Sequence, residues 1–179
     1  MTFHLRPMTL EDVQQVHALD QLCFSLPWSE QSFAYEVEHN RVSRPYVIEW
    51  KGTQGEHRLA AMMVCWQVMD EVQVATLAVH PDFQRQGIAR WLLAHGLLQA
   101  ASEGADHAFL EVRIGNLSAQ ALYRLFGFEV VGQRSGYYRD TNEDALLMIL
   151  DSFDLPRLQA WAEHKAGTAP AQEENDDNN

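Results

Sequence analysis

The stretch HPDFQRQGIARWLL, residues 80 to 93, joins an apolar run to a helical pattern and decides how the chain folds. The run before it, VQVATLAV at residues 72 to 79, is rich in β-branched residues and predicts a strand that stops at His80-Pro81. From Gly87 to about Ser102, the apolar residues recur at helical spacing. The junction therefore predicts a strand, a turn and a helix, as in α/β proteins.

The turn between these two elements has the composition of an anion site. Gly87 allows close approach to the backbone, and the small Ala89 keeps the first helical turn uncluttered. The first amides of a helix have no partner inside it, and the helix dipole makes that end positive. With Arg85 and Arg90 beside them, these amides predict a phosphate ligand. An ordinary structural turn is the alternative, because the stretch contains neither a Walker loop nor a GxGxxG motif.

Length and composition predict one globular domain. The chain has 179 residues, 46% of them hydrophobic, which suffices for a core without a disulfide or metal. Cys23 and Cys65 lie far apart, without CxxC spacing or a nearby histidine cluster, so we expect reduced thiols and no metal site. The chain shows no signal peptide and no apolar run of the roughly 20 residues that span a bilayer. We therefore expect a cytoplasmic protein without a membrane partner.

The formal net charge of −12 limits the partners further. Nonspecific nucleic-acid binding needs Lys and Arg to neutralise phosphates, so we expect no nucleic-acid partner, whereas a basic protein partner is compatible with the charge. We expect residues 1–151 to form the domain and residues 152–166 to hold a further short helix. Residues 167–179 are too polar to pack and are expected to form a disordered acidic tail. The sequence leaves the oligomeric state open.

Periodicity and capping residues predict the remaining elements. Thr9, Ser29 and Asn116 are predicted helix N-caps, and Trp28 and Phe33 are spaced as a hydrophobic staple. The predicted strands are residues 2–8, 45–50, 58–69, 72–79, 107–114, 128–138 and 145–151. The predicted helices are residues 9–24, 29–39, 87–102, 116–127 and 155–165.

Three motifs in this order give the chain a family resemblance. Gln84-x-x-Gly87-x-Ala89 follows TLAV, then comes LEVR at residues 110 to 113, then N-x-x-A-x-x-L-Y-x-x-x-G-F at residues 116 to 128. Over about residues 3 to 151, the chain resembles the GCN5-related N-acetyltransferase (GNAT) superfamily. Within it, the likeness is greatest to bacterial enzymes that acetylate the N-terminal alanine of a ribosomal protein. The stretches FSLPWSEQSF, AVHPDFQRQGIAR, LEVRIGN, ALYRLFGF and EDALLMIL carry that likeness.

The resemblance implies a GNAT fold of the α+β type. Such a fold has a mixed, mostly antiparallel sheet of about seven strands, flanked by four helices and splayed open beside the fourth strand. Acetyl-CoA, the implied cosubstrate, would lie in the gap, and no metal would take part. The backbone of Leu77, Ala78 and Val79 would pair with its pantetheine arm. The turn formed by Arg85, Gln86, Gly87, Ile88, Ala89 and Arg90 would bind its pyrophosphate.

Asn116 also acquires a second role from the resemblance. The corresponding residue of the resembling enzymes contacts the cofactor. A simple helix N-cap is the structural alternative, and it does not exclude the contact.

Glu111 is the candidate proton acceptor. Acetyl transfer to an amine needs a group that removes the amine's proton. By resemblance, Glu111 takes it directly or through water. A carboxylate within a covered strand is costly unless it is paired or functional. Glu111 and Arg113 share a strand face, so a structural ion pair between them is the alternative.

Tyr123 is the candidate proton donor. By resemblance, it protonates the leaving thiolate, and a phenol with an ordinary pKa near 10 carries its proton at neutral pH. A helical wheel places Tyr123 off the arc of its apolar neighbours, which favours function over packing. That arc consists of Leu117, Ala121, Leu122 and Leu125. A tyrosine at the rim, packed on the next strand, is the alternative.

The acceptor is predicted to be a protein N-terminus. At pH 7 roughly a tenth of α-amino groups but only about 0.04% of lysine amines are neutral. Trp28, Tyr137 and Tyr138 are candidates for the walls of a peptide groove, although aromatic residues near turns are packing residues as often. The partner would be a ribosomal protein that starts with alanine. An acetyltransferase for a small-molecule amine and a non-catalytic acyl-CoA-binding module are the alternatives.

Overall fold

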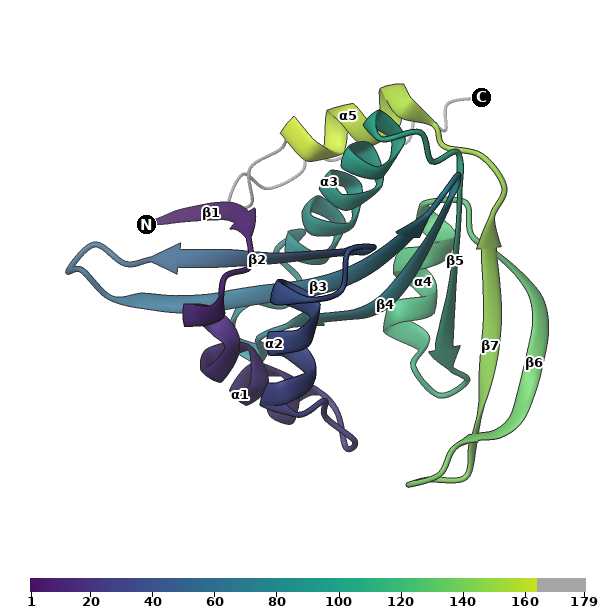
Figure 1. Cartoon of the computed structure of the whole chain (residues 1–179), viewed down its shortest axis with the longest axis horizontal. Helices are drawn as coiled ribbons and strands as arrows, with labels where there is room; N and C mark the ends of the chain where they lie inside the picture. The colour runs from purple at the N-terminus through teal and green to yellow at the C-terminus, as the bar shows by residue number, and fades with distance from the viewer. Residues whose placement is uncertain (164–179) are drawn as a thin grey trace, which may run out of the picture.

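Seven strands form one sheet between two layers of helices in the computed structural model, which describes residues 1–163 (Figure 1). The strands are β1 (Thr2–Pro7), β2 (Ser43–Lys51), β3 (His57–Val68), β4 (Glu71–Val79), β5 (His107–Arg113), β6 (Glu129–Tyr138) and β7 (Glu143–Leu150). The helices are α1 (Val13–Cys23), α2 (Glu30–Glu38), α3 (Ile88–Ser102), α4 (Leu117–Leu125) and α5 (Leu155–Glu163). Each predicted strand and helix is present, with ends that differ by a few residues.

The order of the strands in the sheet is β1-β2-β3-β4-β5-β7-β6. Every neighbouring pair is antiparallel except β4 and β5, so the predicted mixed, mostly antiparallel sheet is confirmed. The parallel pair is short, because β4 and β5 are matched only from Glu71 and His107 to Val74 and Leu110. Figure 1 shows the two strands meeting at one end and diverging towards the other. The predicted splay beside the fourth strand is therefore present.

A β-bulge in β4 accounts for the divergence. Val64 of β3 lies opposite Thr76, but the next residue, Cys65, lies opposite Val74, so Ala75 is an extra residue in β4. A bulge bends the strand that contains it and increases its twist. This one follows directly after Val74, the last residue of β4 that is matched with β5. The bend therefore turns the rest of β4 away from β5.

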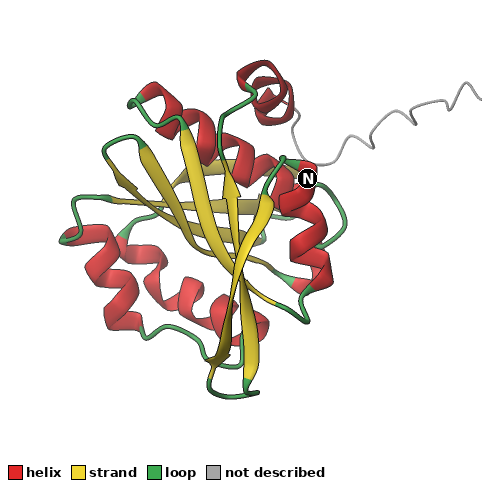
Figure 2. Cartoon of the chain, turned by 90° about the vertical axis from the view of Figure 1, so that its right-hand side faces the viewer, coloured by secondary structure: helices red, strands yellow, loops and turns green. Residues whose placement is uncertain are grey.

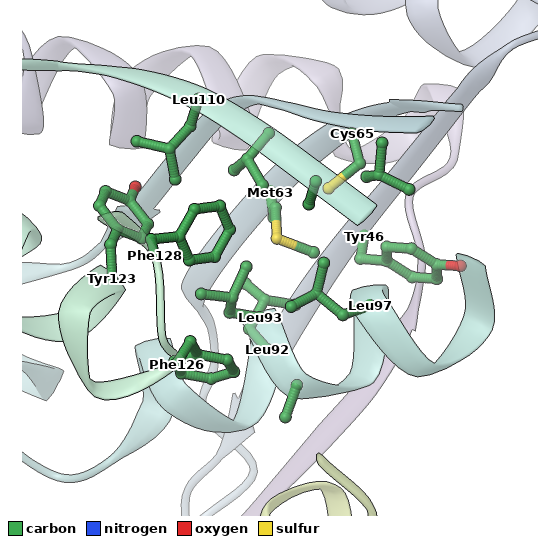
Figure 3. Close-up of a cluster of buried hydrophobic side chains, with 14 of the residues drawn as sticks. Tyr46, Met63, Cys65, Leu92, Leu93, Leu97, Leu110, Tyr123, Phe126 and Phe128 are labelled. Carbon is green, nitrogen blue, oxygen red and sulfur yellow. The ribbon is translucent and has the colours of Figure 1, made fainter. Parts of the chain in front are cut away.

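Helices cover both faces of the sheet (Figure 2), and a hydrophobic cluster lies on each face. Met62 and Val64 of β3 point to the face under α1 and α2, whereas Met63 and Cys65 point to the face under α3, α4 and α5. This alternation follows from the two-residue period of a strand. Figure 3 shows the larger cluster, in which α3 packs its leucines against Met63.

The chain's final described helix packs against α3. The Trp91 indole of α3 donates to the carbonyl of Ala162 at 2.9 Å, and the rings of Phe126 and Trp161 lie 4.6 Å apart. The predicted tail, residues 167–179, lies outside the described residues. None of the helices within residues 1–163 is long and apolar enough to span a membrane.

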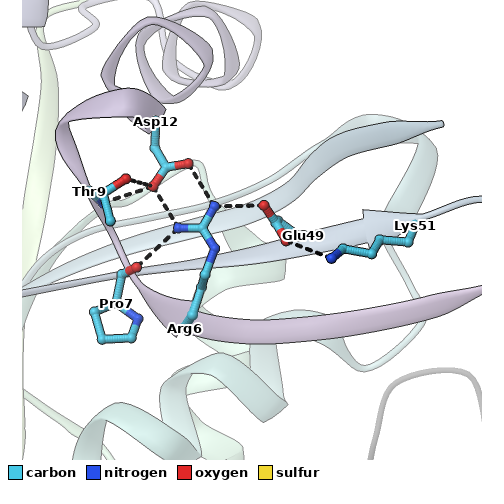
Figure 4. Close-up of polar contacts among 6 residues, drawn as sticks. All are labelled: Arg6, Pro7, Thr9, Asp12, Glu49 and Lys51. Atoms are coloured by element: carbon cyan, nitrogen blue, oxygen red, sulfur yellow. Dashed lines mark hydrogen bonds and ion pairs between the residues drawn. The ribbon is translucent and has the colours of Figure 1, made fainter. Parts of the chain in front are cut away.

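Arg6 fixes the entry into the first helix (Figure 4). Its guanidinium pairs with Asp12 and with Glu49 of β2, both at 2.7 Å, and lowers the pKa of Glu49. The hydroxyl of Thr9 donates to the same Asp12 carboxylate at 2.9 Å. Thr9 therefore caps a short 3-10 turn, Leu10–Asp12, and α1 itself begins later than predicted.

Candidate active site

A cavity of about 530 Å³ opens where β4 and β5 separate. Its walls come from five parts of the fold: the end of α1 with the loop that follows, β4, β5, α4 and the β6–β7 hairpin. The sequence-predicted site residues that line it are Trp28, Leu77, Glu111, Asn116, Tyr123 and Tyr138. The splayed sheet thus brings together residues of the predicted cofactor, catalytic and substrate groups.

The end of β4 presents alternate backbone groups to the gap. The His80 amide donates to the carbonyl of Ala60 in β3 at 2.8 Å. Hydrogen-bonded and non-hydrogen-bonded pairs alternate along antiparallel strands. It follows that the backbone of Ala78 pairs with β3, while the backbone groups of Leu77 and Val79 face away from it. Of the three predicted cofactor contacts on β4, Leu77 and Val79 therefore face the gap and Ala78 does not. The Val79 carbonyl accepts hydrogen bonds from Gln84 Nε2 at 3.1 Å and from Cys23 Sγ at 3.5 Å.

The predicted phosphate turn presents consecutive unpaired amides. Arg85 and Gly87 adopt left-handed backbone conformations, with φ of 61° and 78°. The first hydrogen bond of α3 runs from the Trp91 amide to the Gly87 carbonyl at 2.9 Å. Within residues 1–163, no acceptor pairs with the amides of residues 85–90. An exposed helix start with this backbone geometry suits an anion.

The side chains of this turn divide between the core and the surface. Ile88 is buried, and Ala89 is half-buried behind it. The guanidinium carbon of Arg90 lies 5.7 Å from the ring centre of an α5 tryptophan. Arg85 and Gln86 are exposed, so the outer side of the turn is open to a ligand.

The Glu111 carboxylate is paired, but not with the predicted residue. Its side chain is only 12% exposed, and its Oε1 lies 2.5 Å from the Arg134 guanidinium of β6. The alternative of a Glu111–Arg113 pair is wrong. Arg113 turns instead towards the β6–β7 loop, where it donates to Asp140 at 2.7 Å and stacks over Tyr138 at 3.9 Å. Glu111 finds its partner two strands away, across β7, and Arg113 finds its partner in the β6–β7 loop.

Tyr123 lines the cavity, but the helical-wheel argument for it is wrong. Tyr123 is 8% exposed and packs against Phe128, whereas Leu117 and Leu125 of the predicted arc are 71% and 42% exposed. The buried amide of Gln120 sets the packing face by donating to the carbonyls of Arg113 and Ile114 at 3.1 and 2.8 Å. Tyr123 follows Gln120 by three residues, about one helical turn, so it lies on the same face of α4 and packs inward.

Burial does not remove the proton-donor chemistry of Tyr123. Figure 3 shows the ring against Phe128, with its hydroxyl end beside Leu110 of β5. Burial raises the pKa of Tyr123 well above its usual range. The phenol is therefore protonated at neutral pH, as a proton donor must be.

Asn116 is a helix N-cap that also faces the cavity. Its side-chain oxygen accepts the amide of Ala119 at 3.1 Å, which confirms the predicted cap. Asn116 also lines the cavity, as Tyr123 does. The two alternatives considered from the sequence are thus compatible in the folded chain.

Trp28 forms part of the cavity wall. Its ring lies 5.4 Å from Phe33, as predicted for a hydrophobic staple, and stacks on Trp66 at 6.1 Å. Two residues one turn apart on α1 hold its backbone: the carboxylate of Asp20 accepts its amide at 2.7 Å, and His17 lies 2.8 Å from its carbonyl oxygen. Asp20, which no sequence pattern singles out, is buried and lines the cavity.

The two tyrosines of the β6–β7 hairpin have different environments. Tyr138 lines the cavity, and burial raises its pKa to about 12. Tyr137 is exposed and does not line the cavity; a hydrogen bond to the Glu111 carboxylate raises its pKa. The rings lie edge to face, 5.2 Å apart. Only Tyr138 of this pair is therefore placed as a wall of the cavity.

Arg113 also ties the two loops at the cavity mouth. It donates to Ser25 in the loop after α1 at 3.2 Å and to Thr141 in the β6–β7 loop at 2.8 Å. Ser25 in turn hydrogen-bonds to Asp140 across the mouth. These contacts join segments that lie far apart in the sequence, and no pattern in the sequence predicts them.

A possible metal-ligand cluster lies away from the cavity. Among the described residues, Asp70, Asp106 and His107 have ligand atoms within 4.8 Å of one another. Both ring nitrogens of His107 face carboxylates, Asp106 at 2.7 Å and Glu71 at 3.4 Å, and the hydrogen bond to Asp106 raises its pKa. With both ring nitrogens of His107 beside carboxylates, this is a polar surface cluster at the starts of β4 and β5.

The family model of the acetyltransferase (GNAT) family matches residues 13–128. The chain belongs to the GNAT family. It is therefore an N-acetyltransferase, and acetyl-CoA is the acyl donor that GNAT enzymes use. The predicted resemblance is confirmed.

The similarity to individual GNAT proteins extends over most of this chain. The [ribosomal protein bS18]-alanine N-acetyltransferase of Escherichia coli strain K12 is 36% identical over 141 residues, which are 78% of this chain and 90% of that protein. The crystal structure of the ribosomal-protein-S18-alanine N-acetyltransferase from Escherichia coli matches with a TM-score of 0.74 and 31% identity, over 84% of this chain and 94% of that one. Arabidopsis thaliana NAA60 in complex with acetyl-CoA matches with a TM-score of 0.73 and 17% identity, over 85% and 99%, which shows the GNAT fold alone.

Proposed function

We propose that this GNAT enzyme transfers the acetyl group of acetyl-CoA to the N-terminal α-amine of a ribosomal protein, the counterpart of bS18, at an alanine. One observation carries the proposal: a carboxylate and a protonated phenol, Glu111 and Tyr123, line one cavity beside the free edge of β4. The relatives named for bS18-alanine acetylation support the acceptor, because they share more than 30% identity over most of both chains.

The roles follow from the position of each group. The backbone of Leu77 and Val79 would pair with the pantetheine arm, and the amides of residues 85–90 would bind the pyrophosphate. Glu111 would take a proton from the acceptor amine, directly or through water, as the nitrogen–carbon bond forms. Tyr123 would give its proton to the sulfur as the carbon–sulfur bond breaks. The proton lost from the amine and the proton gained by the thiol thus have separate carriers.

The walls of the cavity suit the end of a basic polypeptide. Trp28 and Tyr138 supply aromatic surface, and Glu143 adds a carboxylate to that of Glu111. The net charge of −12 favours encounter with a basic protein, an attraction that salt screens. The α-amine has the further advantage that far more of it is neutral at pH 7 than of a lysine amine.

A panel of acceptors tests the proposal. The enzyme would be incubated with acetyl-CoA and, separately, with an alanine-starting peptide of the ribosomal protein, the same peptide blocked at its N-terminus, and spermidine. We expect transfer to the free peptide to exceed transfer to the other two at least tenfold in kcat/KM. Faster transfer to spermidine would favour the small-amine alternative. Binding of acetyl-CoA without transfer to any acceptor would favour the non-catalytic alternative.

A further inference from the structure

The proposed proton acceptor is held by residues of β6 that lie outside the chemistry described above. Arg134 Nη1 lies 2.5 Å from Glu111 Oε1. The same carboxylate raises the pKa of the Tyr137 phenol, which places Tyr137 in its immediate surroundings. The guanidinium of Arg134 also lies 5.7 Å from the Tyr137 ring. Glu111, Arg134 and Tyr137 therefore form one contiguous group at the cavity's edge.

An irregularity in β6 builds this group. Arg134 lies opposite Ala145 of β7, and Tyr138 lies opposite Glu143, so residues 135–137 of β6 face a single residue of β7. That residue, Asp144, accepts the amide of Gly136 at 2.8 Å and a hydrogen bond from Gln133. Gly136 has a positive φ of 59°, which a bulge of this kind requires. Because of this bulge, Tyr137 approaches the Glu111 carboxylate, which Arg134 also contacts.

The register of the sheet explains why Arg134, and not Arg113, pairs with Glu111. Arg134 and Arg113 both lie opposite Ala145, on its two sides in β6 and β5. Arg113 is committed to Asp140 and to the ring of Tyr138. The small Ala145 between the two arginines offers no side chain that would block Arg134. Arg134 can therefore extend across β7 to Glu111.

We infer that Arg134 is a positioning residue for acetyl transfer, whose guanidinium orients the Glu111 carboxylate next to the acceptor amine. This inference rests on the proposed role of Glu111. A charge-assisted contact of this kind fixes the direction of a carboxylate more firmly than a neutral hydrogen bond, and Arg134 supplies it. A reacting group must also be held within a fraction of an ångström of its productive position. The contact with Arg134 fixes one oxygen of Glu111 and so holds the carboxylate in place.

Arg134 contributes little to the stability of the fold. Its side chain is 57% exposed, and an ion pair with such an exposed partner stabilises a protein only weakly. A substitution at Arg134 should therefore leave the fold intact. Its effect on turnover can be measured without loss of folded enzyme, as the melting temperature would show.

The test compares Arg134→Gln and Arg134→Lys with the wild type in acetyl transfer to an alanine-starting peptide. We expect Arg134→Gln to lower kcat about 10- to 100-fold while the KM values for peptide and acetyl-CoA change less than about threefold. Arg134→Lys should recover kcat to within about threefold of the wild type, because it restores the positive charge. Arg139→Gln is the matched control: it removes the same charge five residues later, where no ion pair forms within residues 1–163, and should leave kcat unchanged.

A second arm separates this inference from the role of Glu111. If Arg134 acts through Glu111, adding Arg134→Gln to Glu111→Gln should lower kcat by less than about twofold further. A wild-type kcat for Arg134→Gln beside an impaired Glu111→Gln would overturn the inference and leave the proposed function intact. A raised peptide KM at unchanged kcat would also overturn it, because Arg134 would then bind the acceptor. A wild-type kcat for Glu111→Gln would instead contradict the proposed chemistry.

Discussion

Val74 and Leu110 are the last residues that β4 and β5 hold side by side. The bulge at Ala75 follows at once, and the cavity begins there, with Val74, Ala75, Thr76 and Leu77 in its wall. One extra residue in one strand thus creates both the free edge of β4 and the space beside it. The predictions below test the groups that this opening brings together.

Gly87→Val should abolish the stabilisation of the protein by acetyl-CoA. A ligand at 100 times its Kd stabilises the native state by about 2.7 kcal/mol, or roughly 5 to 11 °C in melting temperature for a chain of this size. A valine cannot readily adopt the φ of 78° at this position, so the phosphate turn would change shape. Thermal unfolding with and without acetyl-CoA measures the effect.

Gly55→Val is the matched control for the phosphate turn. Gly55 has a φ of 89° and open space around it, in the turn between β2 and β3. The substitution imposes a similar strain, a valine at a positive φ, and leaves residues 85–90 unchanged. It should lower the melting temperature and keep the acetyl-CoA shift. An acetyl-CoA shift that survives in Gly87→Val as well would remove the phosphate turn from our account.

Tyr123→Phe should lower kcat by about 10² to 10³, within the range of general acid–base catalysis or just below it. The ring keeps its packing on Phe128, and a proton donated only as the thiolate leaves contributes to the transition state alone. The affinity for acetyl-CoA should change less than about threefold. Tyr46→Phe removes a hydroxyl from another buried tyrosine, which packs on His95, and should leave kcat unchanged. Wild-type turnover in Tyr123→Phe would show that water supplies the proton.

Gln120→Ala should destabilise the protein by about 1 kcal/mol or more, because two partly buried carbonyl groups lose a donor. It should also lower kcat, since the Gln120 amide sets the face of α4 that carries Tyr123. Urea unfolding and turnover measure the two effects. Gln15→Ala, at an exposed position of α1, should change stability by less than about 0.5 kcal/mol. A stable, fully active Gln120→Ala enzyme would contradict the anchoring role.

The contact between the two loops at the cavity mouth should depend on pH. Hydrogen bonds from Arg113 and Ser25 lower the pKa of Asp140 to about 2. Because the folded-state pKa is depressed, the stabilisation is complete above the ordinary pKa of 3.8 and is lost as the pH falls towards 2. Asp140→Asn should therefore be less stable than the wild type at pH 7, with a difference that shrinks between pH 4 and pH 2. Urea unfolding across this range checks it, and a difference that is constant with pH would contradict it.

The sequence predicts the elements well where periodicity and caps are local. The strand over residues 72–79 and the caps at Ser29 and Asn116 follow from a few neighbouring residues. The splay could not be predicted from such patterns, because Ala75 resembles any small residue within an apolar run. The splay was predicted only from the resemblance to the GNAT family, and the bulge at Ala75 explains it.

The site was predictable in its residue types but not in its contacts. The helical wheel for α4 failed because it counted apolar residues, whereas a buried polar residue, Gln120, anchors the helix. Arg134 was missed because the bulge at residues 135–137 breaks the alternation on which strand patterns depend. Both contacts join segments that only the folded chain brings together.

The most direct test is to locate the acetyl group on the ribosomal counterpart of bS18 after incubation with the enzyme and acetyl-CoA. Tandem mass spectrometry of the unmodified, alanine-starting protein would distinguish its α-amine from its lysines. Our account predicts acetylation of the N-terminal alanine by the wild type and a large loss of that product with Glu111→Gln. Acetylation confined to lysine side chains, or an equal yield from Glu111→Gln, would contradict it.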